Sequence, residues 1–465
     1  MHKTLAPRLI PALMAIAFAG GAHASGFQLL GEQSASSLGN AGAGSAAVAE
    51  NASTIYYNPA GMTQLQAREV SLGLTAVRTN FEFNDGGSSN LGALNNTGDG
   101  GNGGKLRAVP NFYGSWAVTK DIYIGLGIGA PFGLMTEYND PWKGSAHSQS
   151  FEIKTINVNP SIAWRANEWL SLGAGINWQR IDAEYVRRVA VTGVPNTGCS
   201  ISVPQNAVCN SHANMQLDDD AWGWNIGALF TLAPQTKVGV SYRSKIKYDA
   251  TGNVNVSGPN PTVAVVPGVG AVGLNAAGSS NVKASIDLPD TWIVSLSQGI
   301  GSQWELLADV SWTGWSSIPK VDILRSSSTP TSASGSNVQT LDTNFDDAWR
   351  FALGANYKLN DAWKLRFGVA YDQTPVPNAQ SRLTSLPDND RTWLSTGFQW
   401  KMAKNMTTDV GFAYLFVKDA PIDNNQSVTS PPATPQQAAS ANKGTIKGEY
   451  DNSAWLLGAQ FSMSF

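Results

Sequence analysis

Few residues of this chain have types and spacing that could carry out chemistry. Beyond the first two dozen residues the only histidines are His147 and His212, both in polar segments with the character of loops. No Gly-x-Ser-x-Gly elbow supplies a nucleophile, and no glycine-rich phosphate loop follows a strand. The sequence therefore predicts neither an enzyme nor a nucleotide-driven machine.

Cys199 and Cys209 lie in one segment, 196–214, that is rich in Pro, Ser, Asn and Gly. Only His212 is nearby, so no known metal-ligand pattern is formed, and we expect neither a metal nor a cofactor. A disulfide between the two cysteines is the favoured prediction, because the N-terminus indicates export to an oxidising compartment. Two free thiols are the alternative.

The N-terminus has the organisation of an export signal. His2, Lys3 and Arg8 precede an apolar run from Leu9 to Ala19, and Ala22-His23-Ala24 has the small residues of a cleavage site. The apolar run is too short to span a bilayer as a helix. Residues 1–24 are thus predicted to be a signal peptide.

The composition indicates a membrane-spanning β-structure. Charged residues make up only 14% of the chain, while it contains 47 glycines and 16 tryptophans. In lipid every backbone polar group needs an internal partner, which only helices and closed barrels provide. A net charge of -3 with no basic stripe gives no reason to expect nucleic-acid binding.

The elements that would position any site are alternating strands. In 122–130 isoleucines and a leucine alternate with a nearly bare face of glycines, and 304–312 and 349–357 alternate with tryptophan or tyrosine at their ends. Such segments recur fourteen times, near 67–83, 108–119, 121–135, 150–166, 168–190, 215–233, 236–255, 281–300, 303–325, 341–359, 362–376, 387–402, 405–420 and 447–465. Short and long connections alternate between them. We therefore predict an all-β fold, a 14-stranded antiparallel transmembrane β-barrel spanning residues 67–465. Its last strand should pair with the first.

Residues 25–66 do not alternate and are small and weakly amphipathic. A barrel of fourteen strands is wide enough to hold water unless something fills it. We expect these residues to form a hatch, a plug inside the lumen.

Several motifs together resemble the long-chain fatty acid transporter family, the FadL-type outer-membrane proteins that include the aromatic-hydrocarbon uptake barrels. The motifs extend from the start of the predicted mature chain to near its end: Ser25–Leu29, Tyr57–Gly61, Pro131–Leu134, Thr136–Tyr138, Leu288–Trp292, Asp347–Arg350, Tyr371–Asp372, Pro375–Pro377 and Leu386–Arg391. The resemblance implies a plugged fourteen-stranded barrel in the bacterial outer membrane. It also implies passive uptake of hydrophobic molecules that leave sideways into the membrane.

Two elements of the exit route follow from the resemblance. Pro131, Phe132 and Gly133 interrupt the third strand, where proline has no N–H to donate and glycine permits a bulge. They are expected to form the lateral gate, with an ordinary strand end as the alternative. Asn58, Pro59, Ala60 and Gly61 form a turn that the resemblance implies is the part of the hatch nearest this gate.

Charged residues are candidates for the substrate's carboxylate or for contacts inside the barrel. Arg187 and Arg188 end the fifth strand, where the resemblance implies a carboxylate contact, and Arg187 is the better match. A solvated charge at the barrel rim is the alternative. Lys320 and Arg325 are candidates for a second contact. Asp347, Arg350, Asp390 and Arg391 stand at strand starts, either paired in the lumen or solvated at the rim.

The function predicted from these residues is uptake of a hydrophobic small molecule, with long-chain fatty acid as the favoured substrate. Aromatic hydrocarbons and, less favoured, a general diffusion porin are the alternatives. The expected surroundings are outer-membrane lipid and lipopolysaccharide. We expect the barrel to be a monomer.

Overall fold

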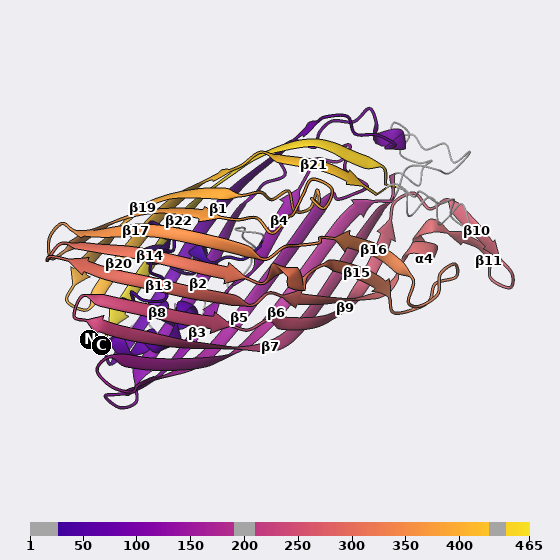
Figure 1. The fold of residues 1–465 in the computed structure, drawn as a ribbon. Helices are drawn as coiled ribbons and strands as arrows, with labels where there is room; N and C mark the ends of the chain where they lie inside the picture. The colour runs from indigo at the N-terminus through magenta and orange to yellow at the C-terminus, as the bar shows by residue number, and fades with distance from the viewer. Residues whose placement is uncertain (1–26, 190–209, 427–442) are drawn as a thin grey trace, which may run out of the picture.

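The computed structural model describes residues 27–189, 210–426 and 443–465, which form one elongated barrel (Figure 1). The predicted signal peptide and the two cysteines, Cys199 and Cys209, lie outside the described residues. No helix of the described part is long and apolar enough to cross a membrane.

Fourteen antiparallel barrel strands make up the wall, and six of them are divided by a bend into two segments each. In chain order they are β1 (Arg68–Asp85), β2 (Leu106–Ala117), β3 (Ile122–Gly129) with β4 (Gly133–Glu137), β5 (Ser150–Arg165), β6 (Leu170–Arg188), β7 (His212–Ala233), β8 (Thr236–Arg243) with β9 (Ile246–Ser257), β12 (Ser280–Leu288) with β13 (Thr291–Ile300), β14 (Trp304–Thr313) with β15 (Lys320–Arg325), β16 (Asn337–Asp342) with β17 (Ala348–Lys358), β18 (Trp363–Asp372), β19 (Arg391–Ala403), β20 (Met406–Val417) with β21 (Ala420–Asn425), and β22 (Thr445–Ser464). The predicted number of strands is confirmed.

The barrel closes between its last and first strands. β22 pairs with β1 from Glu69↔Ser464 to Asp85↔Gly448. The remaining elements are the hairpin of β10 (Thr262–Val266) and β11 (Gly270–Gly273) and the short helices η3 (Gly92–Leu94), α4 (Leu274–Gly278) and η5 (Trp315–Ser317), of which η5 links β14 to β15. The hairpin projects at the end with the long connections, opposite the C-terminus (Figure 1).

The outer face of the wall is apolar, as alternation predicts. Leu72, Leu74, Leu306 and Leu353 are exposed, and the rings of Trp304 and Tyr357 pack together at a tilt near the short connections. These side chains have lipid as their solvent, because lipid-facing and lumen-facing residues alternate along each strand.

The hatch lies inside the lumen as four short helical turns: η1 (Gly31–Gln33), α2 (Ala35–Gly39), α3 (Thr54–Tyr57) and η2 (Pro59–Gln64). Nearly all of its side chains are buried. Helices this short have no stability of their own, so packing against the wall must hold them. The lumen-facing glycines allow this packing: a Cβ on Gly239 would come within 1.9 Å of the Ala46 carbonyl oxygen.

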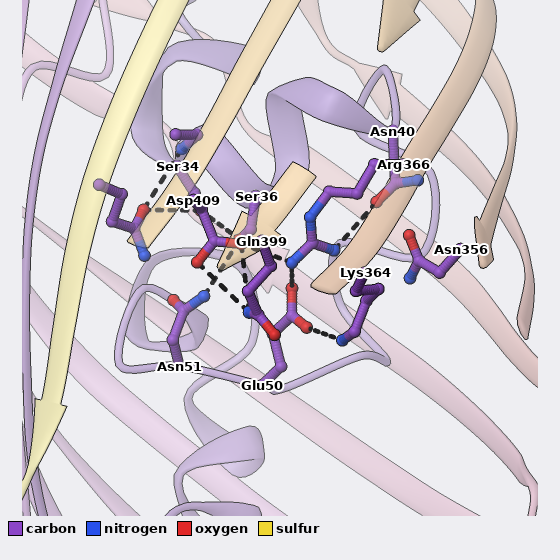
Figure 2. Close-up of polar contacts among 12 residues, drawn as sticks. Ser34, Ser36, Asn40, Glu50, Asn51, Asn356, Lys364, Arg366, Gln399 and Asp409 are labelled. Carbon is purple, nitrogen blue, oxygen red and sulfur yellow. Dashed lines mark hydrogen bonds and ion pairs between the residues drawn. The ribbon is translucent and has the colours of Figure 1, made fainter. Parts of the chain in front are cut away.

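A buried ion network joins the hatch to β18 and β20 near the short connections (Figure 2). Glu50 of the hatch binds Arg366 Nη2 at 2.6 Å and Lys364 Nζ at 2.7 Å. The same Arg366 nitrogen lies 2.6 Å from Asp409 Oδ1, and Gln399 also donates to that carboxylate. Burial alone would raise the pKa of Glu50, but the charges of Arg366 and Lys364 lower it to about 2. Because each buried carboxylate has a cationic partner, this network fixes the body of the hatch to one side of the wall.

Replacing Arg366 by Met removes the cation that Glu50 and Asp409 share. We expect the free energy of unfolding to fall by about 3–5 kcal/mol, the usual cost of breaking a buried ion pair. Urea unfolding in lipid vesicles, followed by tryptophan fluorescence, measures it.

Two further variants complete this test. Lys358→Met breaks an exposed pair with Asp361, at 2.8 Å, and should leave the unfolding curve unchanged. Adding Glu50→Gln and Asp409→Asn to Arg366→Met should restore part of the loss, because no unpaired charge then stays buried. Equal effects of Arg366→Met and Lys358→Met would contradict the anchoring role.

Candidate functional site

An apolar cavity of about 670 Å³ lies inside the barrel beyond the hatch. Its wall includes Phe27 from the start of the described chain, Leu134 from β4, Tyr185 from β6 and Val321 from β15. Thr343 and Ser385 are the only other lining residues with a side-chain hydroxyl besides Tyr185. The lining suits a hydrocarbon, because small-molecule pockets are lined mainly by apolar and aromatic side chains.

Two buried cations lie beside one end of this cavity. Arg187 is two residues beyond the lining residue Tyr185, and its Nε donates to Gln339 Oε1 at 3.0 Å. Lys443 Nζ donates to the same oxygen at 2.6 Å and to Gln426 Oε1 at 3.0 Å. A single neutral carboxamide oxygen is therefore shared by two cations, a position that a carboxylate would occupy with greater stabilisation.

Neither cation has an acidic partner among the described residues. The segments outside the description, 1–26, 190–209 and 427–442, contain no Asp or Glu. Burial, together with the charge of Arg187, places the pKa of Lys443 well below its usual range. His147 is also buried here, and burial lowers its pKa to about 3, so it stays neutral. An anion entering from outside would relieve this unbalanced charge.

Arg188, the second predicted carboxylate contact, has another role. It forms a bidentate ion pair with Asp140, at 2.6 and 2.7 Å, and His212 binds the same carboxylate at 2.9 Å. The pair connects the segment before β5 to the ends of β6 and β7. Because its guanidinium is already neutralised, Arg188 does not face the cavity as a free cation.

The candidates for a second carboxylate contact, Lys320 and Arg325, are not beside Arg187. Lys320 is exposed and pairs with Asp322 at 2.7 Å. Arg325 donates to the Gly278 carbonyl and to Ser280. Lys443 lies beside Arg187 instead, on the same Gln339 oxygen, and the sequence analysis missed it. Its one signal is isolation, since it is the only charged residue between Asp423 and Lys447.

The predicted interruption of the third strand is present. β3 ends at Gly129 and β4 starts at Gly133. The intervening backbone turns to the hatch: Leu29 N donates to the Pro131 carbonyl at 2.7 Å, and Gly133 N donates to the Phe27 carbonyl at 2.8 Å. Thr155 bonds both the amide and the carbonyl of Phe132. The start of the hatch thus replaces a strand as the partner of the break.

Beside this break, β2 and β4 are not joined by the backbone hydrogen bonds of a regular sheet. β2 pairs with β3 only from Phe112↔Ile128 to Ala117↔Tyr123, and among the described strands β4 pairs with β5 alone. The next backbone bond across the gap is from Glu137 N to the Gly103 carbonyl, at 2.9 Å. Between these two points the barrel wall has no backbone closure in the described chain.

The turn Asn58–Gly61 is not the part of the hatch nearest the break, contrary to our expectation. Asn58 Nδ2 donates to the carbonyls of Ala46 and Ala228, and its Oδ1 accepts from Ala60 N. The turn therefore packs against β7, where the absence of a side chain on Gly227 leaves room for it. The residues nearest the break are Phe27–Leu29.

The four predicted lumenal charges divide into two groups. Arg350 donates to the Ala41 carbonyl of the hatch at 2.5 Å, and Arg391 pairs with Asp388 at 3.1 Å. Asp347 is exposed, and Asp390 accepts from the outward-facing Tyr371. For these two aspartates the lumenal expectation is wrong and the rim alternative holds. Alternation places Asp347, three residues before the inward Arg350, and Asp390, next to the inward Arg391, on the outer side.

The described residues contain no group of His, Cys, Asp and Glu side chains that could hold a metal ion. The exposed carboxylate of Asp218 pairs with Arg180 at 2.7 Å. The site combines an apolar cavity, two buried cations and a break in the wall.

Comparison with known proteins gives relatives that match this architecture. The chain is 29% identical to the long-chain fatty acid transport protein of Escherichia coli K12 over the full length of both. It is 30% identical to the protein of the same name from Salmonella typhi, again over the full length of both.

Solved structures show the same fold. A Pseudomonas aeruginosa FadL homologue superimposes with a TM-score of 0.79 at 22% identity, covering 95% of this chain and 100% of the homologue. The Ralstonia pickettii toluene transporter TbuX gives 0.64 at 20% identity, covering 94% and 99%. The model of the family of outer membrane protein transport proteins (OMPP1/FadL/TodX) matches residues 15–465. The chain belongs to this family and is a barrel of the bacterial outer membrane.

Proposed function

We propose that this barrel takes up long-chain fatty acids, binding the chain in the apolar cavity and the carboxylate between Arg187 and Lys443. The single observation that carries this proposal is the pair of buried cations that share one amide oxygen and have no acidic partner. The relatives from E. coli and S. typhi are named for the same substrate.

Aromatic hydrocarbons are the alternative substrate, because a related solved structure is a toluene transporter. The apolar lining suits either class. An uncharged hydrocarbon would leave Arg187 and Lys443 buried without a counterion, which costs free energy. The cations therefore favour an acidic head group.

The proposed route leads sideways. The hatch body is fixed by the Glu50 network, so the axial path stays filled. The segment Phe27–Leu29 borders both the cavity and the break at Pro131–Gly133. In our proposal the acyl chain displaces this segment and leaves between β2 and β4. The hatch comprises residues 25–66 in this account, and the protein acts as a monomer without catalysis.

Arg187→Gln and Lys443→Gln should each weaken binding of oleate to the purified barrel. The expected loss is about ten- to a hundredfold, equivalent to one hydrogen bond between charged groups. Titration calorimetry measures it, with oleyl alcohol as the uncharged ligand, whose affinity should change little.

The matched control for this prediction is Arg325→Gln. Arg325 is likewise buried and has only neutral partners, on a strand beside Gln339. Oleate binding by this variant should equal that of the unaltered protein. Unchanged oleate affinity in both Arg187→Gln and Lys443→Gln would overturn the carboxylate assignment and favour the hydrocarbon alternative.

A disulfide between residues 28 and 132 tests the lateral route. Gln28 and Phe132 are opposite each other in an antiparallel bridge flanked by the two hatch-to-break bonds. Their Cα atoms thus have the close spacing of a non-hydrogen-bonded pair, about 4.5 Å, which a disulfide can span. Gln28→Cys with Phe132→Cys, in a background with serine at 199 and 209, should abolish oleate uptake until a reductant is added.

Each single cysteine variant serves as the control for the disulfide experiment. Uptake that continues at the normal rate with the 28–132 bond closed would show that the substrate leaves by another path.

A further inference from the structure

The opening between β2 and β4 is crossed by side chains in place of backbone hydrogen bonds. Lys105 Nζ lies 3.2 Å from Glu137 Oε2. The guanidinium of Arg107 contacts the sulfur of Met135. Lys105 and Arg107 are two residues apart and therefore belong to one face of the extended chain.

Both cations start from the lumen side and reach toward the outside. On β2 the same face carries Asn111, which donates to the Glu32 carbonyl of the hatch. On β4 the lumen face carries Leu134 and Thr136, so Met135 and Glu137 are on the outer face. The two cations thus extend through the gap, from the inner face of one strand to the outer face of the other.

The gap lies at the extracellular edge of the apolar band. On β1 the outward residues change from Leu72 and Leu74 to Arg78 and Glu82 along the strand. Arg78 is paired with Leu106, the residue between the two cations. A charged group is stable at such an edge, whereas it is costly deeper in the hydrocarbon.

The strand register connects this edge to the cavity's cations. Glu137 is paired with Ser150, and Ser150 is paired with Val186, the residue before Arg187. Arg187 and the cations at the opening are therefore close in register, on strands separated only by β5. A bound head group can pass from one to the other over about 10 Å, two strand spacings.

From this geometry we propose that Lys105 and Arg107 form a second anion site, at the mouth of the opening. It accepts the substrate's carboxylate after Arg187 and Lys443 release it, while the acyl chain enters the bilayer. In the unliganded barrel Lys105 forms an ion pair with Glu137, and the arriving carboxylate replaces Glu137 as the partner of Lys105. This inference rests on the proposed function, uptake of an acidic amphiphile with a lateral exit.

The test separates binding from release. Lys105→Gln with Arg107→Gln should leave oleate affinity of the purified barrel within twofold of the unaltered value. Uptake of labelled oleate by cells that lack their own fatty acid transporter should fall about tenfold, as expected for the loss of a charge-assisted hydrogen bond. Uptake of oleyl alcohol, which has the same chain without the charge, should be unchanged.

Arg78→Gln is the matched control, because Arg78 is a cation at the same level on the neighbouring strand, next to Leu106 in register. Its oleate uptake should be normal. Heat-dependent migration in detergent gels confirms that each variant barrel is folded.

Other outcomes overturn the proposal. Equal changes in oleate and alcohol uptake would show that the two cations only hold the wall together, and normal oleate uptake in the double variant would show that they have no role. Glu137→Gln separates the same ideas: a selective rise in oleate uptake supports the anion site, whereas an equal rise for both ligands contradicts it. If unaltered protein bound oleyl alcohol as tightly as oleate, the proposed function itself would fail.

Discussion

The structure depends on one constraint: inside a bilayer, every backbone N–H and carbonyl needs a partner within the protein. The wall meets this requirement by closing β22 on β1, and it fails to do so between β2 and β4. The unpaired backbone at the break is satisfied from within, by Leu29 N and the Phe27 carbonyl, by the side chain of Gln33 on the Ala130 carbonyl, and by Thr155. An opening can therefore exist in the wall only because the start of the hatch covers it.

This arrangement divides the hatch into two parts with different energetics. The body is held by buried ion pairs through Glu50 and by close packing on lumenal glycines such as Gly239. The first residues are held at the break by a few hydrogen bonds, each worth about 1 kcal/mol. A ligand that competes with Phe27 for the cavity can displace the second part without disturbing the first. In this account the hatch body blocks flow along the barrel axis while its first residues move aside for lateral exit.

Much of the fold followed from periodicity. Alternation predicted fourteen strands, their approximate ends and the pairing of the last with the first, because lipid on one side and a lumen on the other impose a period of two. The break at Pro131–Gly133 was visible since proline and glycine have specific backbone effects. The plug was inferred from a segment without alternation.

The site was less predictable, because its residues come from distant parts of the chain. Lys443 meets Arg187 across 256 positions only through the tertiary fold. The sequence does not distinguish Arg188 from the adjacent Arg187. In the fold the two side chains point to opposite faces of the strand, and Arg188 forms an ion pair with Asp140. The inward arginines were separable from the outward Asp347 and Asp390 only once the register was known. Lys105 and Arg107 could not be singled out from the sequence, because their proposed role depends on the absence of backbone pairing between β2 and β4.

The central claim is that the ligand releases a short segment from the break while the hatch body stays in place. Hydrogen–deuterium exchange of the barrel in lipid nanodiscs, with and without oleate, tests it most directly. The account predicts that oleate accelerates exchange at the amides of Leu29 and Gly133 and leaves those of α2 and η2 protected. Exchange that rises across the whole hatch, or that does not change at Leu29 and Gly133, would contradict it.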